Sequence, residues 1–204
     1  FATHIGMSVD RERAISRPTP LAQPGDTVYL CTADAEGNLV SFISSLFQGS
    51  GVVAEETGIQ LHNRGALFTL EDGHPNRMAP QKRPFHTLMP GLAVRHGAPH
   101  LAFGVMGGHH QPQGHVQFLV NLMLHAMDLQ EAVSAPRFDF RVENFVALER
   151  DFPPDVVEGL TQRGHKVVEN DAGPFGGAQA IRLMDDGVME GASDTRKDGC
   201  ALGI

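Results

Sequence analysis

The sequence contains no tryptophan, one tyrosine and two cysteines among its 204 residues. So few stacking aromatics argue against a platform for nucleic-acid bases. Its 24 acidic residues outnumber its 16 basic ones, which argues against nucleic acid or an anionic membrane surface as partner. Cys31 and Cys200 are too far apart in sequence to form a disulfide framework or a paired-cysteine metal motif. No apolar run reaches the length of about 18 residues that a membrane span requires.

Hydrophobic residues make up 41% of the chain and charged residues 20%, which predicts one packed domain. The chain begins with Phe1 rather than methionine and shows no signal-peptide pattern, so we expect a processed piece of a longer protein. Residues 1–26 are rich in proline and charge and are predicted to form an extended linker. Regular structure is expected from Thr27, and the domain to span 27–204.

Periodicity predicts hairpins interleaved with a few helices, an α+β fold with mainly antiparallel sheets. The expected strands are 27–33, 39–47, 58–62, 91–96, 100–105, 143–148, 165–169, 178–184 and 188–191. Helices are expected at 115–127, after a capping box at 128–131, and at 154–163. The first helix carries an apolar stripe that we expect to be buried, formed by Val116, Leu119, Val120, Met123 and Met127. Residues 69–84 are predicted to form a long surface loop.

Six short motifs occur in a fixed order along the chain. They are Gly25-Asp-Thr27, Arg83-Pro-Phe-His-Thr-Leu-Met-Pro90, Gly104-Val-Met-Gly-Gly108, Ala135-Pro-Arg137, Gly176-Gly-Ala-Gln179 and Gly191-Ala-Ser-Asp-Thr-Arg-Lys-Asp-Gly199. Together they resemble the small subunit of the gamma-glutamyltransferases and their acylase-like relatives, which are N-terminal-nucleophile hydrolases. The resemblance covers nearly the whole chain and implies a four-layer αββα sandwich, of which this chain supplies part.

The resemblance also implies a mechanism, in which a precursor cuts itself at the Asp26–Thr27 bond. Thr27 then becomes a new N-terminus, its hydroxyl the nucleophile and its α-amine the base. This fits elementary chemistry, because a threonine hydroxyl is a weak nucleophile until a base removes its proton. An α-amine has a pKa of about 7.7–8.0 and is already attached to the nucleophile. The expected reaction is hydrolysis or transfer of an acyl group from a small amide or peptide through an acyl-Thr27 ester.

Other site residues follow from the same resemblance. Gly107 and Gly108 match the paired glycines whose N–H groups form an oxyanion hole, a role that needs close backbone approach. Ser45 matches a hydroxyl residue that contacts the nucleophile, with Ser44 as the competing choice, since alternation lets only one of them face the site. His86-Thr87 replaces a serine pair that holds substrate, and either substrate contact or a structural role is possible for it.

One departure from the family pattern concerns the substrate. Ala66 and Leu67 stand where gamma-glutamyltransferases carry acidic residues that pair with the donor ammonium. Arg64 is instead available for a carboxylate or carbonyl group. This weakens glutathione as the substrate and favours the acylase-like branch.

The implied partner is a large-subunit-like upstream region of the same precursor, and a homo-oligomer stays open. No cofactor is implied. A metal site at His109, His110 and His115 is disfavoured because their spacing matches no standard ligand pattern. The alternative hypothesis is a non-catalytic or truncated relative that folds and associates without cleaving itself.

Overall fold

The N-terminal hairpin forms as the sequence predicts. The structure is a computed structural model that describes residues 27–140, 145–169 and 175–204. Strand β1 (Thr27–Ala33) pairs antiparallel with β2 (Leu39–Ser45), and the register places Thr27 opposite Ser45. The Asp34 carboxylate accepts the N–H groups of Glu36 and Asn38 and so closes the turn between the strands.

The second sheet has four strands in the order β11-β10-β6-β5, all antiparallel. Its strands are β5 (Gly91–Arg95), β6 (Ala98–Met106), β10 (Gly177–Leu183) and β11 (Met189–Ser193). β6 is buried continuously over 101–105, as expected of a strand covered on both faces.

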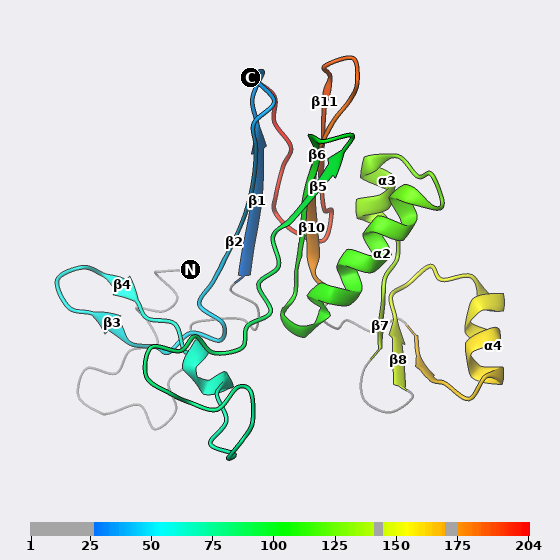
Figure 1. Ribbon diagram of the computed structural model, residues 1–204. Coiled ribbons are helices and arrows are strands. Elements are labelled where there is room, and N and C mark those ends of the chain that lie inside the picture. The colour runs from blue at the N-terminus through cyan, green and yellow to red at the C-terminus, as the bar shows by residue number, and fades with distance from the viewer. Residues whose placement is uncertain (1–26, 141–144, 170–174) are drawn as a thin grey trace, which may run out of the picture.

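This sheet is the middle of three layers (Figure 1). Helices α2 (Gln111–Met123) and α3 (Leu129–Ser134) cover one face, and the β1–β2 hairpin covers the other. The core lies mainly between the sheet and the helices. It includes Leu101, Phe103, Val105, Phe118, Leu129 and Val133.

Between the two sheets, the Tyr29 ring lies directly on Gly104. A Cβ atom at Gly104 would lie 2.4 Å from that ring, so only glycine allows the hairpin to approach the sheet this closely. The Tyr29 hydroxyl is 2.8 Å from the Ser41 hydroxyl, and burial raises the pKa of the tyrosine.

A smaller three-stranded sheet lies beyond the helices (Figure 1). It comprises β7 (Phe138–Phe140), β8 (Phe145–Leu148) and β9 (Lys166–Val168), with α4 (Pro154–Gln162) joining β8 to β9. The β8–β9 pair is parallel, unlike the other strand pairs of the described residues. The shorter elements are β3 (Val53–Ala54), β4 (Ile59–Gln60), and the 3₁₀ turns η1 (Arg64–Leu67) and η2 (Gly108–His110). The predicted α+β class with mainly antiparallel sheets is confirmed.

The expected limits of the first helix are wrong. α2 begins at Gln111, four residues before the prediction, and ends at Met123. Its first turn contains Pro112, whose fixed φ suits a helix start and whose missing N–H needs no partner there. The second predicted helix is confirmed with its capping box. Asp128 accepts the N–H of Glu131 at 2.7 Å, and Glu131 accepts that of Asp128 at 3.1 Å.

The expected buried stripe of this helix is correct only in part. Leu119 and Met127 are partly buried and pack against the core, but Val116 and Met123 are 61% and 72% exposed. The fully buried residues of the helix include Gly114, His115 and Phe118. The polar His115 side chain is buried there because its Nε2 accepts the Val105 N–H at 3.0 Å, which removes the cost of an unpaired group.

Two glutamines tie α2 to the edge of β7. The Gln113 side chain accepts the Phe140 N–H at 2.8 Å and donates to the Phe140 carbonyl at 2.9 Å. Gln117 makes the same two bonds with Phe138, both at 2.9 Å. Because residues four apart share one helix face, the two amides pair with the strand as a neighbouring strand would.

No helix among the described residues is long and apolar enough to cross a membrane. The predicted linker 1–26 and the first two residues of the expected strand 143–148 lie outside the described residues.

Candidate active site

Thr27 and Ser45 meet at one end of the hairpin. The Thr27 side chain is 8% exposed, and its hydroxyl donates to the Ser45 hydroxyl oxygen at 3.0 Å. That oxygen also accepts the Phe47 N–H at 2.9 Å, which fixes the serine rotamer. Ser44 is exposed on the opposite face of the strand. The contact with Thr27 is therefore made by Ser45 and not by Ser44.

The chain turns sharply at Gly107 and Gly108, where β6 ends. Their φ angles are +139° and +59°, which side-chain-bearing residues rarely adopt. A Cβ atom on Gly107 would also lie 2.9 Å from the Cα of Gly176. Within the described parts of the chain, no acceptor bonds the N–H of either Gly107 or Gly108. Two adjacent N–H groups are thus available to a ligand.

The start of β1, at Thr27, and the end of β6, from which the glycine turn continues, lie at the same end of the layers (Figure 1). The contact between the Tyr29 ring and Gly104 shows how β1 and β6 are aligned. Thr27 precedes Tyr29 by two residues in β1, and Met106 follows Gly104 by two residues in β6. Both therefore lie about 7 Å from this contact, toward the same end of the layers. The fold thus brings the inward-facing Thr27 hydroxyl toward the start of the glycine turn.

The segment 83–90 is tied to the residues that follow the glycine turn. The Phe85 ring stacks on His109 with centroids 6.4 Å apart. The Met89 N–H donates to the Gln111 side-chain carbonyl at 3.2 Å. Gln111 is fully buried, and its side-chain nitrogen has no partner among the described residues.

The His86-Thr87 pair lies between these two contacts, but its members differ in environment. The Thr87 side chain is buried, at 6% exposure. His86 is exposed, and its Nδ1 accepts the N–H of Leu88 at 3.2 Å. Thr87 is therefore the member that the fold holds on the inner side of the segment.

Arg64 is a buried cation near the end of β2. Its guanidinium lies 4.8 Å above the Phe47 ring, and the residue is 7% exposed. Burial lowers the pKa of this guanidinium. No carboxylate of the described residues pairs with it, and the neighbouring Ala66 and Leu67 offer none. Arg64 is thus a positive group beside Phe47 that has no counter-ion among the described residues.

The three clustered histidines do not converge. His109 stacks on a phenylalanine, and His110 Nδ1 is 3.1 Å from Asp139 Oδ1. His115 accepts a backbone N–H, and burial lowers its pKa to about 4. In residues 27–140, 145–169 and 175–204, no three His, Cys, Asp or Glu side chains form a group that could hold a metal ion.

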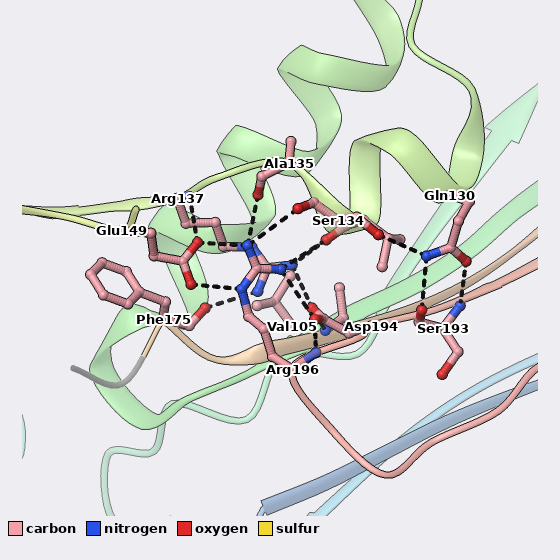
Figure 2. Close-up of polar contacts among 12 residues, drawn as sticks. Val105, Gln130, Ser134, Ala135, Arg137, Glu149, Phe175, Ser193, Asp194 and Arg196 are labelled. Carbon is pink, nitrogen blue, oxygen red and sulfur yellow. Dashed lines mark hydrogen bonds and ion pairs between the residues drawn. The ribbon is translucent and has the colours of Figure 1, made fainter. Parts of the chain in front are cut away.

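A buried ion network, which the sequence motifs contain but did not explain, supports this end of the fold (Figure 2). Arg137 pairs with Asp194 at 2.7 Å, and both are almost fully buried. Arg196 binds Asp194 at 3.1 Å and Glu149 at 2.6 Å. Arg137 also donates to the carbonyl of Phe175, next to the glycine that touches Gly107. Arg137 and Asp194 each lie in one of the six motifs, but the sequence could not show that they meet, because they are 57 residues apart.

Comparison with known proteins agrees with this geometry. Residues 3–204 match the gamma-glutamyltranspeptidase family. The chain belongs to this family. It is 40% identical to the glutathione hydrolase-like YwrD proenzyme of Bacillus subtilis, over 88% of the chain, and 38% identical to the oxamate amidohydrolase proenzyme of Klebsiella pneumoniae, also over 88%. The cephalosporin acylase structure from Bacillus halodurans has a TM-score of 0.81 at 43% identity, covering 84% of this chain and 33% of that one.

These relatives confirm the expected resemblance and its acylase-like branch. They also confirm the fold type, which is the αββα sandwich of the N-terminal-nucleophile hydrolases. This chain contributes three of its layers: the hairpin, the four-stranded sheet and the helices. The chain spans 36% of the length of either proenzyme.

Proposed function

We propose that this family member is the catalytic portion, residues 27–204, of an autoprocessed amidohydrolase or acyltransferase with Thr27 as nucleophile. The Thr27 hydroxyl attacks the amide carbonyl carbon, and its proton passes to the Thr27 α-amine. The oxyanion is held by the N–H groups of Gly107 and Gly108. Collapse expels the amine, which takes the proton, and leaves an acyl-Thr27 ester. Water or an acceptor amine then releases the acyl group and restores the hydroxyl.

The observation that carries this proposal is the part-buried Thr27–Ser45 hydrogen bond at the same end of the fold as two glycine N–H groups that bond no described acceptor. The related proenzymes named as hydrolases support it. In the precursor the same hydroxyl attacks the carbonyl of Asp26, giving an ester that water hydrolyses, so that the chain is cut at Asp26–Thr27. Residues 1–26 are then the end of an upstream piece.

Intact mass spectrometry of the precursor tests both roles. We expect wild type to yield a species that begins at Thr27 and that hydrolyses anilide amides. Thr27→Ala should abolish the cut and the activity together. Thr32→Ala is the matched control, because Thr32 lies on the exposed face of the same strand. An uncut wild-type precursor without amidase activity would instead establish the non-catalytic alternative.

We further propose that Arg64 binds a carboxylate on the acyl group of the donor. Thr87 would line the side of the donor site opposite Arg64, and His86 would lie at the rim of that site. A buried guanidinium without a protein counter-ion is stabilised when an anion binds. The site has no acid at positions 66 and 67 for an ammonium. The relative named for oxamate, itself a carboxylate-bearing amide, agrees with this donor class.

Two donors of equal length test whether the site prefers an acyl group with a carboxylate alone or one that also carries an α-ammonium group. Glutaryl anilide and gamma-glutamyl anilide differ only in the α-ammonium group, and we expect a higher kcat/KM for the glutaryl compound. Arg64→Met should lower that value about 10- to 100-fold, while pentanoyl anilide, which lacks the carboxylate, should be little affected. Equal kcat/KM for glutaryl and gamma-glutamyl donors would remove this assignment.

The upstream region of the same precursor is the partner we propose, lying on the outer face of the hairpin. Val28, Leu30, Val40 and Phe42 are each about half exposed there and share one face of β1 and β2. A four-layer sandwich needs a further layer on this face. We expect Phe42→Asp to release the upstream piece from the processed protein in size-exclusion chromatography, whereas Thr32→Asp on the same face near the turn should have a smaller effect.

A further inference from the structure

The Gly107–Gly108 turn requires support from outside itself. Both residues have positive φ, and their N–H groups bond no described acceptor. Glycine is also the residue with the largest conformational freedom in the unfolded chain. A turn that must present two N–H groups at a fixed point therefore depends on its neighbours for rigidity.

His110 supplies contacts on both sides of this turn. Its N–H donates to the Gly107 carbonyl at 3.1 Å and closes the turn. Its side chain is 1% exposed and packs at a T-shaped angle with the Phe175 ring, with centroids 6.1 Å apart. Phe175 is followed by Gly176, the backbone against which Gly107 packs. The backbone of residue 110 thus contacts the turn, and its imidazole packs on the segment that the turn touches.

Asp139 fixes the orientation of this imidazole. The His110 Nδ1 is 3.1 Å from Asp139 Oδ1, and the same oxygen accepts the Gln113 side-chain N–H at 3.1 Å. Because a carboxylate only accepts, the proton of the neutral ring lies on Nδ1. The Nε2 atom is buried without a partner among the described residues.

The charges around His110 leave the imidazole neutral near pH 7. Burial lowers its pKa most strongly, Asp139 and the more distant Glu149 raise it, and Arg137 lowers it. A second proton would be placed on the buried Nε2, where no described acceptor lies. His110 is therefore a neutral, hydrogen-bonded wedge and not a proton carrier at neutral pH.

We propose that His110, oriented by Asp139, is a positioning residue that holds the Gly107–Gly108 turn in the form that binds the oxyanion. The assignment rests on the proposed function, because it concerns the intermediate formed on Thr27. His110 does not touch the reacting atoms. The backbone N–H of residue 110 holds the Gly107 carbonyl, and the imidazole fixes that backbone in place through its bond to Asp139 and its packing against Phe175.

Steady-state kinetics of the processed protein test this role, with any anilide donor that wild type turns over. His110→Phe keeps a ring but loses the bond to Asp139, and we expect kcat to fall about 10- to 100-fold with KM within about threefold. His110→Asn carries a side-chain N–H near the position of Nδ1 and should recover part of that loss. Asp139→Leu should resemble His110→Phe, and Asp139→Asn, which keeps an acceptor, should be milder.

Controls separate positioning from stability. His125 is an exposed histidine beyond the end of α2, and His125→Gln should match wild type in kcat, KM and melting temperature. If His110→Phe melts lower than wild type, kcat is compared at a temperature where both proteins are fully folded. An unchanged kcat in folded His110→Phe, or an equal loss in His110→Asn, overturns the proposal. A wild-type protein without Thr27-dependent activity would reject the proposed function itself, a separate outcome.

Discussion

At the scale of single residues, the direction in which a side chain points decides its chemistry. Thr27 and Tyr29 face the four-stranded sheet, whereas Val28 between them is 59% exposed. The sequence predicted that side chains alternate along the strand, and it left Ser44 and Ser45 as two alternatives for the contact with Thr27. Only the register of β1 against β2, with Thr27 opposite Ser45, shows which serine lies within reach of the Thr27 hydroxyl.

Removal of the Ser45 hydroxyl should weaken catalysis without unfolding the hairpin. In Ser45→Ala the Thr27 hydroxyl loses its 3.0 Å partner and gains rotational freedom. We expect slower appearance of the Thr27 N-terminus and an anilide kcat lower by about tenfold or more. Ser44→Ala is the matched control on the exposed face and should process at the wild-type rate. Equal behaviour of the two variants would contradict the assignment of Ser45.

At the scale of elements, α2 shows how internal hydrogen bonds override hydrophobic periodicity. The apolar stripe predicted the buried face only in part, because the polar His115 and Gln117 have partners inside the fold and take places on that face. A buried polar group that is fully bonded costs little, so the helix is not required to turn its most apolar face inward. The sequence alone could not show that Val116 and Met123 are exposed, because their exposure depends on how the helix packs on the sheet.

The amide pairing between α2 and β7 should contribute measurably to stability. Gln117→Ala removes two hydrogen bonds to Phe138 and leaves both of its backbone groups without that partner. We expect the free energy of unfolding in urea to fall by about 1–3 kcal/mol. Asn121→Ala on the same helix is the comparison, since the Asn121 side chain makes no hydrogen bond with the described residues. A loss in Gln117→Ala no larger than in Asn121→Ala would show that the pairing adds nothing.

At the scale of the whole molecule, the buried ions join segments that are far apart in sequence. Asp194, after β11, binds Arg137, after α3, and accepts the Ala178 N–H of β10 at 2.7 Å. Glu149 adds the end of β8 through Arg196. The network in Figure 2 therefore connects the four-stranded sheet, the helices and the small sheet. Its contacts to Phe175 extend that connection toward the glycine turn.

Removing one partner of the Arg137–Asp194 pair should lower the free energy of unfolding more than expected for a pair whose partners act independently. Asp194→Leu leaves the Arg137 charge buried without its carboxylate, and we expect a loss of about 3–5 kcal/mol in urea unfolding. The double variant Arg137→Met with Asp194→Leu should lose less than the sum of the single changes. Asp198→Asn, on an exposed residue nearby, is the control. Strict additivity of the two changes would refute a coupled ion pair.

The free energy of unfolding should fall as the solution is acidified, because the pKa of His115 is lower in the folded protein than in the unfolded chain. Its pKa is lowered to about 4 in the folded protein, against about 6.5 in the unfolded chain. The unfolded chain therefore binds more protons between these values, so stability is complete above about pH 6.5 and declines toward pH 4, by about 3 kcal/mol. His110, whose pKa is also lowered, acts in the same direction.

Urea titrations at several pH values between 4 and 7 measure this slope. His115→Gln keeps an acceptor for the Val105 N–H but does not titrate, so the slope should decrease. The exposed His125→Gln should leave it unchanged. A slope in His115→Gln as steep as in wild type would assign the acid sensitivity to other groups.

The sequence by itself determined the family, the α+β class and the order of most strands, because turn residues, alternation and ordered motifs are local properties of the chain. It also named Thr27, Gly107 and Gly108 before their geometry was known. Only the tertiary structure decided the partner of the Thr27 hydroxyl, the burial of Arg64 away from every described carboxylate and the contacts of His110 with Asp139 and Phe175. These depend on contacts between segments distant in sequence, and such contacts form only when sheets, helices and turns pack together.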